Sequence, residues 1–333
     1  IGAKVLFSSS YMPFSEIIKQ INRINPDIVH LNWITGGMMT IEDLSKINVP
    51  IVWSLHDMWA FTDGYHYDEY YDICKHGCPS MPKNFLSDKV FYRKQKTYSK
   101  INNITIIGLS KWMSDCAKSS ALLKNKQHII LPNMIDTSTF RPFDKIKSKE
   151  LWNLSSNKKI ILFGTLNAAD DPRKGFLELS QALHQITVPN VELVIFGSGK
   201  PKYPPDFGFK THYLGNLNND ESLAQLYSAA DVMVVPSLQE NLSNSIMESL
   251  ACATPVVGFN IGGNKDMIDH KENGYLAEPF DVMDLKNGIE WILKNDKRKK
   301  AREKVLLNFD SKIIVKNYIK LYKNILNQKS LLS

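Results

Sequence analysis

Two neighbouring cations lie where an anionic ligand could bind. Arg173 and Lys174 occur in the loop DPRKGF, directly before a helical pattern that begins near Gly175. The amino end of a helix favours anions, so two cations there are electrostatically out of place unless an anion lies between them. A phosphate suits both the fork of the arginine and the point charge of the lysine. The alternative interpretation is a solvated surface pair.

Two carboxylates form a second candidate pair. Glu240 and Glu248 occur in the segment PSLQENLSNSIMESLACATPVVG, which predicts a strand end, a polar turn and a helix. Ser243 or Asn244 would cap this helix and leave backbone N–H groups free in the polar turn. Complementing the helix dipole would explain Glu248, with a gain of about 0.3–1 kcal/mol. It does not explain Glu240, which precedes the helix.

Short apolar runs alternate with amphipathic patterns along the chain, which is typical of βα units around buried parallel sheets. We expect strands at residues 4–7, 27–31, 51–55, 105–109, 129–131, 159–164, 191–196, 211–214, 232–235 and 255–258. We expect helices at residues 16–24, 175–185, 220–229, 244–253, 285–295 and 313–326. In such folds ligands bind at the carboxyl ends of strands, which is where both candidate pairs fall.

The chain is long enough for two domains. Its 333 residues exceed what one hydrophobic core usually supports, and 43% of them are hydrophobic. We predict an α/β protein with two Rossmann-like domains that face each other across a ligand cleft. The parts are expected at residues 1–141 (first domain), 142–157 (polar linker), 158–310 (second domain) and 311–333 (a final helix that packs back on the first domain).

Composition indicates the environment in which we expect the protein to work. No run of about 18 apolar residues occurs, so we expect no membrane-spanning helix. Four cysteines in this length give no disulfide framework, which favours a reducing, cytoplasmic setting. The first residues, IGAKVLF, resemble no signal peptide and look like a strand entered partway, so we expect native N-terminal sequence to precede them.

Several segments, taken in order, carry a family resemblance. They are SLHDMWAFTDGYHY, HIILPNMIDTSTFRP, DPRKGF, the Glu-x7-Glu spacing in QENLSNSIME, ACATPVVGFNIGG and NGYL. From about residue 27 to residue 310 the chain resembles the retaining glycosyltransferases of family four, which have the GT-B fold. The first of these segments resembles a branch that builds bacterial surface polysaccharides.

The resemblance implies roles for the second-domain loop. Glu240 would hydrogen-bond hydroxyls of the donor sugar, and Glu248 would hold the ribose hydroxyls of the nucleotide. Backbone N–H groups around Asn241, Leu242 and Ser243 would face the donor sugar and the diphosphate.

The resemblance also implies a phosphate site and a contribution from the first domain. Arg173 and Lys174 would neutralise the leaving phosphate, beside donor contacts at Gly164 and Thr165. Family members often carry an arginine where this chain has Thr165. His56 would reach from the first domain toward the donor sugar and the reacting centre.

The implied reaction retains configuration through front-face attack by the acceptor hydroxyl, and the departing phosphate oxygen accepts the proton. Two cations and a helix terminus stabilise the leaving group, and the chain has no Asp-x-Asp signature, so we expect no cofactor and no divalent metal. The alternative is that Glu240 acts as a covalent nucleophile.

The segment HDMWAFTDGYHYDEYYDICKHGCP is expected to lie on the acceptor side. Trp59, Tyr65 and His66 could contact an acceptor sugar, and packing within the loop is the alternative. Cys74 and Cys78 could belong to a zinc site, although their spacing is loose and a plain thiol pair fits as well.

Residues 83–126 hold ten Lys and Arg residues against two Asp residues. Their spacing suggests an interfacial helix attracted to an anionic membrane, with a solvated lysine-rich face as the alternative. Nucleic acid is not expected, because no recognised binding motif accompanies the charge. The protein would then be cytoplasmic and peripheral at the inner face of the plasma membrane.

The resemblance implies a hexosyltransferase of capsule, exopolysaccharide or lipopolysaccharide synthesis. It would move sugar from a nucleotide-diphosphate donor to a saccharide or lipid-linked saccharide. A nucleotide-sugar epimerase of the same fold and a non-catalytic sugar-nucleotide-binding module are the alternatives. A dehydrogenase does not fit, because Lys202 occupies the third glycine position after Gly197 and Gly199.

Overall fold

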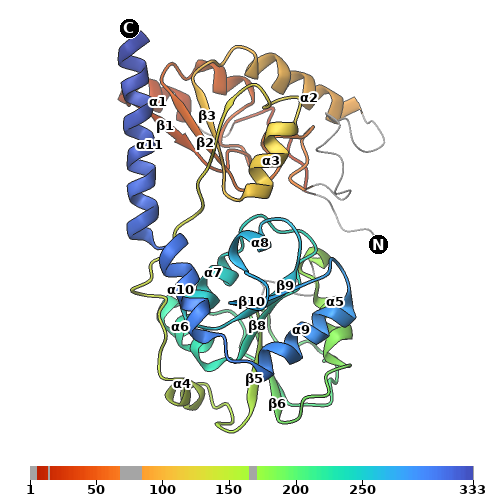
Figure 1. Ribbon diagram of the computed structural model, residues 1–333. Coiled ribbons are helices and arrows are strands. Elements are labelled where there is room, and N and C mark those ends of the chain that lie inside the picture. The colour runs from red at the N-terminus through yellow and green to blue at the C-terminus, as the bar shows by residue number, and fades with distance from the viewer. Residues whose placement is uncertain (1–5, 14–15, 68–84, 165–170, 333) are drawn as a thin grey trace. The chain divides into compact units, whose positions relative to one another are not determined.

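The computed structural model describes residues 6–13, 16–67, 85–164 and 171–332 (Figure 1). The chain separates into two compact units. Unit 1 comprises Ile1–Pro132 and Lys316–Ser333, and unit 2 comprises Asn133–Val315. In each unit helices pack on a parallel sheet, as the alternating pattern of the sequence predicts.

The sheet of unit 1 has the strand order β1-β2-β3-β4, and every described pair is parallel. Its strands are β1 (Val29–Leu31), β2 (Ile51–Leu55), β3 (Ile104–Gly108) and β4 (Gln127–Ile130). All residues of β2 and β3 are buried, which explains their unbroken apolar character. The expected strand at residues 4–7 lies mostly outside the described residues.

Helices of unit 1 surround this sheet. They are α1 (Ile17–Ile24), η1 (Glu42–Lys46), η2 (Trp59–Phe61), α2 (Phe85–Tyr98), α3 (Lys111–Ser119) and most of α11 (Ser311–Leu332). The hydroxyl of Ser110 caps α3 by accepting the backbone N–H of Met113 at 3.1 Å. On α11, the Tyr322 hydroxyl lies 2.7 Å from Nδ1 of His30, which ties the helix to β1.

The sheet of unit 2 has the order β10-β9-β8-β5-β6-β7 and is also parallel. Its strands are β5 (Lys159–Gly164), β6 (Val191–Phe196), β7 (Thr211–Tyr213), β8 (Val232–Val235), β9 (Val256–Phe259) and β10 (Gly274–Ala277). From β5 the chain builds one side of the sheet with β6 and β7, then returns to build the other side from β8. The carboxyl ends of β5 and β8 therefore form a topological switch point, where ligands bind in such sheets.

The helices of unit 2 connect these strands. They are α4 (Lys145–Leu151), η4 (Pro172–Lys174), α5 (Phe176–Leu183), α6 (Asp220–Ala229), α7 (Asn244–Ala251), α8 (Asn264–Met267), α9 (Val282–Lys294) and α10 (Arg298–Asn308). The stretch 142–157 is not the connection between units, contrary to the expectation. It contains α4, capped by Asp144, and belongs to unit 2, while the chain passes between units near residues 132 and 315.

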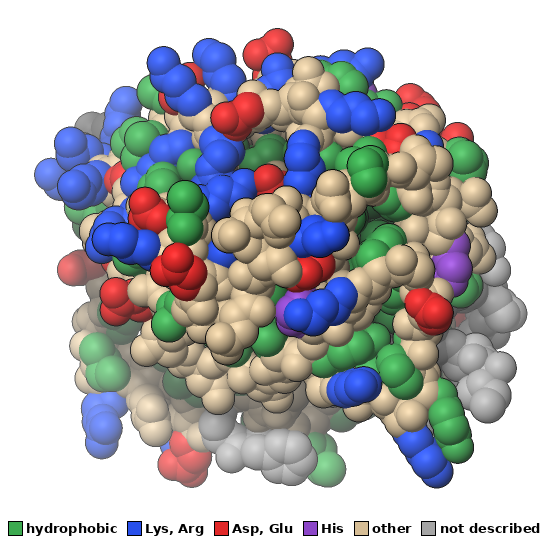
Figure 2. All heavy atoms as spheres, turned by 90° about the horizontal axis from the view of Figure 1, so that it is seen from below, with side chains coloured by type: hydrophobic (Ala, Val, Ile, Leu, Met, Phe, Trp, Pro, Cys, Tyr) green, Lys and Arg blue, Asp and Glu red, His purple; other side chains and the backbone are tan. Residues whose placement is uncertain are grey.

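The surface carries mixed charge. Figure 2 shows Lys and Arg side chains interspersed with Asp and Glu side chains on one face of the molecule. Within the described ranges, no helix is both long and apolar enough to cross a membrane.

Candidate functional site

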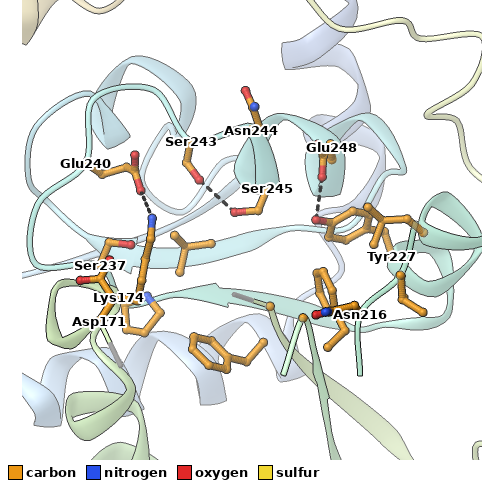
Figure 3. A pocket seen from close by; sticks show the side chains of 18 of the residues that line it. Asp171, Lys174, Asn216, Tyr227, Ser237, Glu240, Ser243, Asn244, Ser245 and Glu248 are labelled. Carbon is orange, nitrogen blue, oxygen red and sulfur yellow. Dashed lines mark hydrogen bonds and ion pairs between the residues drawn. The ribbon is translucent and has the colours of Figure 1, made fainter. Parts of the chain in front are cut away.

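A pocket of about 620 Å³ lies at the carboxyl ends of β5 and β8 in unit 2 (Figure 3). Loops that follow four strands contribute to it, together with the first residues of α7. The candidate residues that line it are Gly164, Lys174, Glu240, Leu242, Ser243 and Glu248. The fold thus brings together groups that are up to 84 positions apart in the chain, since Gly164 and Glu248 share one pocket.

Lys174 and Glu240 meet inside this pocket. The Lys174 ammonium lies 3.3 Å from Oε2 of Glu240. Lys174 comes from η4 and Glu240 from the loop after β8, and the backbone N–H of Leu238 donates to the carbonyl of Arg173 at 2.7 Å to join these two segments. The pair places one positive and one negative group side by side, where a ligand phosphate and a ligand hydroxyl could each find a partner.

Arg173 is oriented differently from its neighbour. Its guanidinium forms a bidentate pair with Asp171, through Nε at 3.0 Å and Nη2 at 2.7 Å. Asp171 also caps η4 by accepting the backbone N–H of Arg173 at 3.1 Å. Among the described residues that line the pocket, Lys174 is present and Arg173 is not. Arg173 therefore pairs with Asp171, which lines the pocket, whereas Lys174 pairs with Glu240.

The backbone around Glu240 is fixed by a close approach of two loops. Its carbonyl accepts the N–H of Gly263 at 3.1 Å. A Cβ on Gly262 would lie 1.9 Å from the same carbonyl oxygen, and Gly262 has φ +48°. Only glycine fits this position, so the loop after β9 holds the backbone of Glu240 in place.

The amino end of α7 is able to bind an anion. Ser243 occupies the N-cap position, but its side chain makes no capping bond to the backbone. Its hydroxyl instead lies 2.9 Å from the hydroxyl of Ser245. The expected serine cap is therefore not formed, and the first N–H groups of α7 remain for a ligand at the pocket wall. Asn241 does not appear among the described lining residues.

Glu248 lies at the other end of the pocket from Glu240 (Figure 3). Its Oε2 accepts a hydrogen bond of 2.9 Å from the hydroxyl of Tyr227, a side chain with no exposed surface. Burial raises the pKa of Glu248, and the hydrogen bond from Tyr227 opposes that rise. The sequence reasoning did not identify Tyr227, and its only signal is an aromatic residue in the helix that precedes β8.

Gly164 makes room for the floor of the pocket. A Cβ at this position would lie 2.0 Å from the ring of Phe196. That ring packs edge-on against Tyr227, with centroids 5.8 Å apart. Gly164, Phe196, Tyr227 and Glu248 thus form a continuous series of contacts. Thr165, the neighbouring expected donor contact, lies outside the described residues.

His56 directly follows β2 of unit 1. Its Nε2 lies 3.0 Å from the side-chain oxygen of Asn32. Partial desolvation lowers the pKa of His56, and the nearby Asp57 opposes this effect. A neutral imidazole at a strand end is able to accept or donate a hydrogen bond, as the resemblance requires.

Trp59 and His66, two of the expected acceptor-side residues, are buried in unit 1. The indole of Trp59 donates to the carbonyl of Ser8 at 2.8 Å. His66 is hydrogen-bonded on both ring nitrogens, to Asp57 at 2.6 Å and to the Ser8 hydroxyl at 2.8 Å. This burial favours the alternative that they pack within the loop.

The remaining expectations for this loop have mixed outcomes. Tyr65 is half-buried and packs edge-on against Phe7, with centroids 5.0 Å apart. Cys74 and Cys78 lie outside the described residues. The residues that are described contain no group of three or more His, Cys, Asp or Glu side chains arranged to hold a metal.

Two cations of the basic stretch 83–126 take part in the packing of unit 1, which was not expected. Lys94 is fully buried, donates to the carbonyls of Trp59 and Thr62, and lies over the Trp59 ring. Burial lowers the pKa of Lys94 well below its usual value. Arg93 pairs with Glu42 at 2.7 Å. These cations stabilise unit 1 and are not available to a solvated basic face.

Part of the chain is similar to known proteins. Residues 144–305 match the family described as glycosyl transferases group 1. N-acetyl-alpha-D-glucosaminyl L-malate synthase of Bacillus anthracis is 23% identical over 68% of this chain and 63% of its own length. D-inositol 3-phosphate glycosyltransferase of Pseudarthrobacter chlorophenolicus is 22% identical over 83% of this chain and 65% of its own length. The chain therefore spans less than two thirds of the length of each of these relatives.

Solved structures show the same fold. Sucrose-phosphate synthase of Thermosynechococcus elongatus matches with a TM-score of 0.67 at 20% identity, covering 96% of this chain and 81% of that one. HepE of Anabaena in complex with UDP matches with a TM-score of 0.67 at 17% identity, covering 93% of this chain and 81% of that one. The GT-B fold class is confirmed, with two parallel-sheet α/β units. The pocket lies within residues 144–305, the part of the chain that matches the group 1 glycosyl transferases.

Proposed function

We propose that this protein is a glycosyltransferase that takes a hexose-type sugar from a nucleotide-diphosphate donor bound in the pocket of unit 2. The observation that carries the proposal is the pocket itself. It combines Lys174, Glu240, the uncapped start of α7 and the Tyr227-bound Glu248 at the switch point of the sheet. The Anabaena neighbour is described in complex with UDP, which supports a nucleotide ligand.

Each group has a role in this proposal. The diphosphate lies between Lys174 and the first N–H groups of α7, while Glu240 holds hydroxyls of the donor sugar and Glu248 holds the ribose. Cleavage of the sugar–phosphate bond builds negative charge on the diphosphate. A cation and aligned N–H groups stabilise such charge, and removing one group of this kind typically costs about 2.7–4 kcal/mol.

The proposal includes retention of configuration and independence from divalent metal. Lys174 and the N–H groups of α7 neutralise the leaving diphosphate, which is the work that a metal would otherwise do. The acceptor hydroxyl attacks from the face that the diphosphate leaves, and a phosphate oxygen takes its proton. A chelator should therefore leave the transfer rate unchanged.

The acceptor is proposed to be a saccharide or lipid-linked saccharide of a bacterial surface polysaccharide, met at the inner face of the plasma membrane. Small polar acceptors are the second candidate, because relatives are described as an N-acetyl-alpha-D-glucosaminyl L-malate synthase and a D-inositol 3-phosphate glycosyltransferase. A panel of acceptors from both classes separates these candidates.

The decisive experiment follows release of nucleoside diphosphate with and without acceptor. UDP-, GDP-, ADP- and TDP-linked sugars are first compared by thermal shift to find the donor. Lys174→Ala and Glu240→Ala are then each expected to lower acceptor-dependent release by about 10²–10³-fold. Lys202→Ala is the matched control, because Lys202 is exposed and does not line the described pocket. Transfer that survives both pocket substitutions contradicts the proposed site, and product formation without any acceptor points to an epimerase.

A further inference from the structure

The outer face of α11 has an unusual charge pattern. From residue 311 to residue 333 the sequence contains no Asp or Glu. Lys312, Lys316, Lys320 and Lys323 follow one another at spacings of four, four and three, which places them on one side of the helix. Over this distance the helix rises by about 16 Å. The opposite side carries Ile314, Leu321 and Ile325, which are buried.

These lysines have no acidic partner in the part of the chain that the structure describes. The ion pairs found there include surface lysines elsewhere, such as Lys300 with Glu303 and Lys304 with Asp269. None of the ion pairs involves the four lysines of α11. Two cations of the 83–126 stretch differ from these lysines, since Lys94 is buried and Arg93 is paired with Glu42.

Aliphatic side chains are exposed between the lysines. Val315 is 39% exposed and Ile319 is 47% exposed. Ile319 lies one turn from both Lys316 and Lys323, so apolar and cationic groups alternate on the same surface. We call this surface the lysine face of α11, and it consists of Lys312, Val315, Lys316, Ile319, Lys320 and Lys323. Exposed aliphatic groups gain from leaving water only if the partner offers an apolar layer.

We propose that the lysine face of α11 docks on an anionic lipid surface. Phospholipid headgroups supply the negative charge, and the interface beneath them accepts Val315 and Ile319 while the lysine ammonium groups stay at headgroup level. Nucleic acid would use the charge but gain nothing from the two aliphatic groups. A membrane position would also bring the protein to a lipid-linked acceptor. Only this consequence rests on the proposed function.

The test is co-sedimentation of the full chain with vesicles of phosphatidylcholine alone or mixed with phosphatidylglycerol. Binding is expected only to the mixed vesicles, and it should weaken as salt is added. Removing one lysine near the surface costs about fivefold in affinity, so Lys316→Gln with Lys323→Gln should cost about 25-fold. Ile319→Ser should weaken binding that remains at high salt.

A matched control comes from the other basic stretch. Lys118 and Lys124 are also exposed, and changing both to Gln removes the same charge from unit 1. This control pair should keep vesicle binding close to that of the unchanged protein. The proposal is overturned if the unchanged protein ignores the mixed vesicles, if the control pair loses as much affinity as the α11 pair, or if heparin binds while vesicles do not. Nucleotide binding by unit 2, measured on each variant, verifies folding and reports on the proposed function separately.

Discussion

Glu248 is held by one hydrogen bond from a tyrosine that has no contact with solvent. Replacing either the carboxylate or the tyrosine changes the hydrogen bonding of the other. The pKa of Glu248 is raised by burial, so its ionised form, which we propose accepts hydrogen bonds from ribose hydroxyls, depends on Tyr227. This dependence leads to two predictions at the scale of single residues.

Tyr227→Phe should weaken binding of a nucleoside diphosphate by about two- to tenfold, since a hydrogen bond of this kind contributes about 0.5–1.5 kcal/mol. Loss of the hydrogen bond also raises the pKa of Glu248 further, so the decline in binding at acidic pH should begin at a higher pH. Calorimetric titration with UDP and with 2′-deoxy-UDP provides the measurement. Preference for the ribose form should shrink in the variant.

Tyr213→Phe is the control for this change. The hydroxyl of Tyr213 is buried and has no hydrogen-bond partner among the described residues. Its removal should leave nucleotide binding and its pH dependence unchanged. Equal losses in both variants would show that Tyr227 acts through general packing and not through Glu248.

Glu248→Gln should increase thermal stability at neutral pH. The folded state binds the proton of Glu248 more tightly than the unfolded chain, because the pKa is raised on folding. Stability is therefore lost as pH rises above the usual pKa of a glutamate, about 4.3, through the folded pKa. Glutamine keeps an acceptor for Tyr227 and has no such cost. For a unit of this size, each 1 kcal/mol of added stability raises Tm by about 2–4 °C.

Melting curves across pH check this prediction. The gain from Glu248→Gln should disappear below the usual glutamate pKa, where both proteins carry a neutral group. Nucleotide binding should be weaker at neutral pH, and the difference should shrink at low pH, where Glu248 is itself neutral. A variant that is less stable than the unchanged protein at neutral pH contradicts the sign of the pKa shift.

At the scale of elements, the ends of β5 and β6 depend on one glycine. Gly164→Ala would drive a Cβ into the ring of Phe196 and should destabilise the protein by about 1–3 kcal/mol. It should also reduce nucleotide binding, because Phe196 supports Tyr227. Gly199→Ala is the control, since a Cβ there meets nothing within 4 Å. Chemical denaturation measures the free energy of unfolding of both variants. Similar losses in the two would argue against a close approach of Gly164 to the Phe196 ring.

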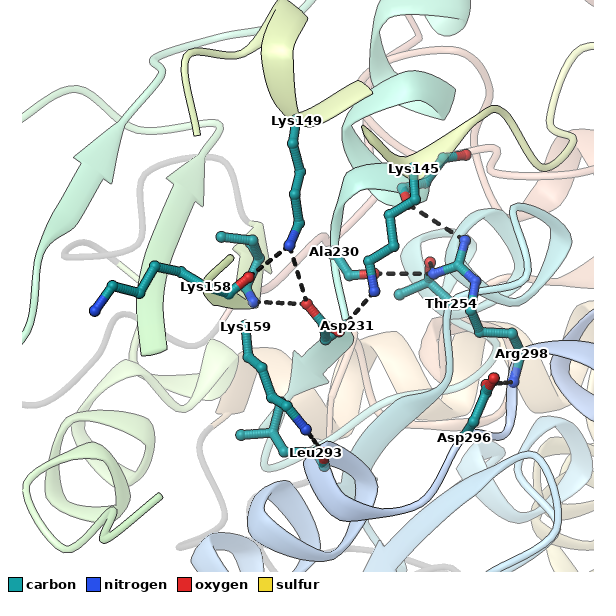
Figure 4. Close-up of polar contacts among 12 residues, drawn as sticks. Lys145, Lys149, Lys158, Lys159, Ala230, Asp231, Thr254, Leu293, Asp296 and Arg298 are labelled. Carbon is teal, nitrogen blue, oxygen red and sulfur yellow. Dashed lines mark hydrogen bonds and ion pairs between the residues drawn. The ribbon is translucent and has the colours of Figure 1, made fainter. Parts of the chain in front are cut away.

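Asp231 joins α4 to the sheet (Figure 4). One of its oxygens lies 2.6 Å from the ammonium of Lys145, and the other accepts the backbone N–H of Ile160 at 2.8 Å. Asp231→Ala removes both contacts, so the free energy of unfolding should fall by about 2–3 kcal/mol. Glu303→Ala removes only exposed pairs with Lys299 and Lys300 and should change it by less than about 0.5 kcal/mol. Denaturant titration distinguishes the two outcomes.

The spacing of apolar residues predicted most of the helices and strands, and those that it missed have physical reasons. β5, β6 and β8 were expected within a residue of their observed bounds, because buried parallel strands are continuously apolar. β10 was not expected, since GYLA is too short to give a period. The stretch 142–157 lacks an apolar stripe, yet it forms α4 because Asp144 caps the helix and Asp231 binds Lys145.

At the scale of the whole molecule, the sequence predicted which residues belong to the pocket better than what each one contacts. Lys174, Glu240 and Glu248 meet in one pocket because all three follow or flank strand ends at the switch point. Their partners depend on side-chain packing, which spacing does not reveal. Asp171 forms an ion pair with Arg173, and Tyr227 reaches Glu248 from another helix.

Aromatic residues show the same division. Trp59 and His66 looked like ligand contacts because they follow a strand end in a polar, aromatic loop. They are buried because Ser8, Asp57 and Lys94 satisfy their polar atoms or cover their rings. Sequence alone cannot distinguish an aromatic group that awaits a sugar from one that already has its neighbours.

The tryptophan cluster around His66 also determines how the protein can be observed. Trp33 and Trp59 pack near that histidine, and Trp53 packs on Trp59. With Trp112, four of the six tryptophans belong to unit 1, whereas none of the residues described around the pocket of unit 2 is a tryptophan. Intrinsic fluorescence therefore follows the unfolding of unit 1 more closely than that of unit 2. A ligand that stabilises only unit 2 would be recorded more faithfully by calorimetry than by emission.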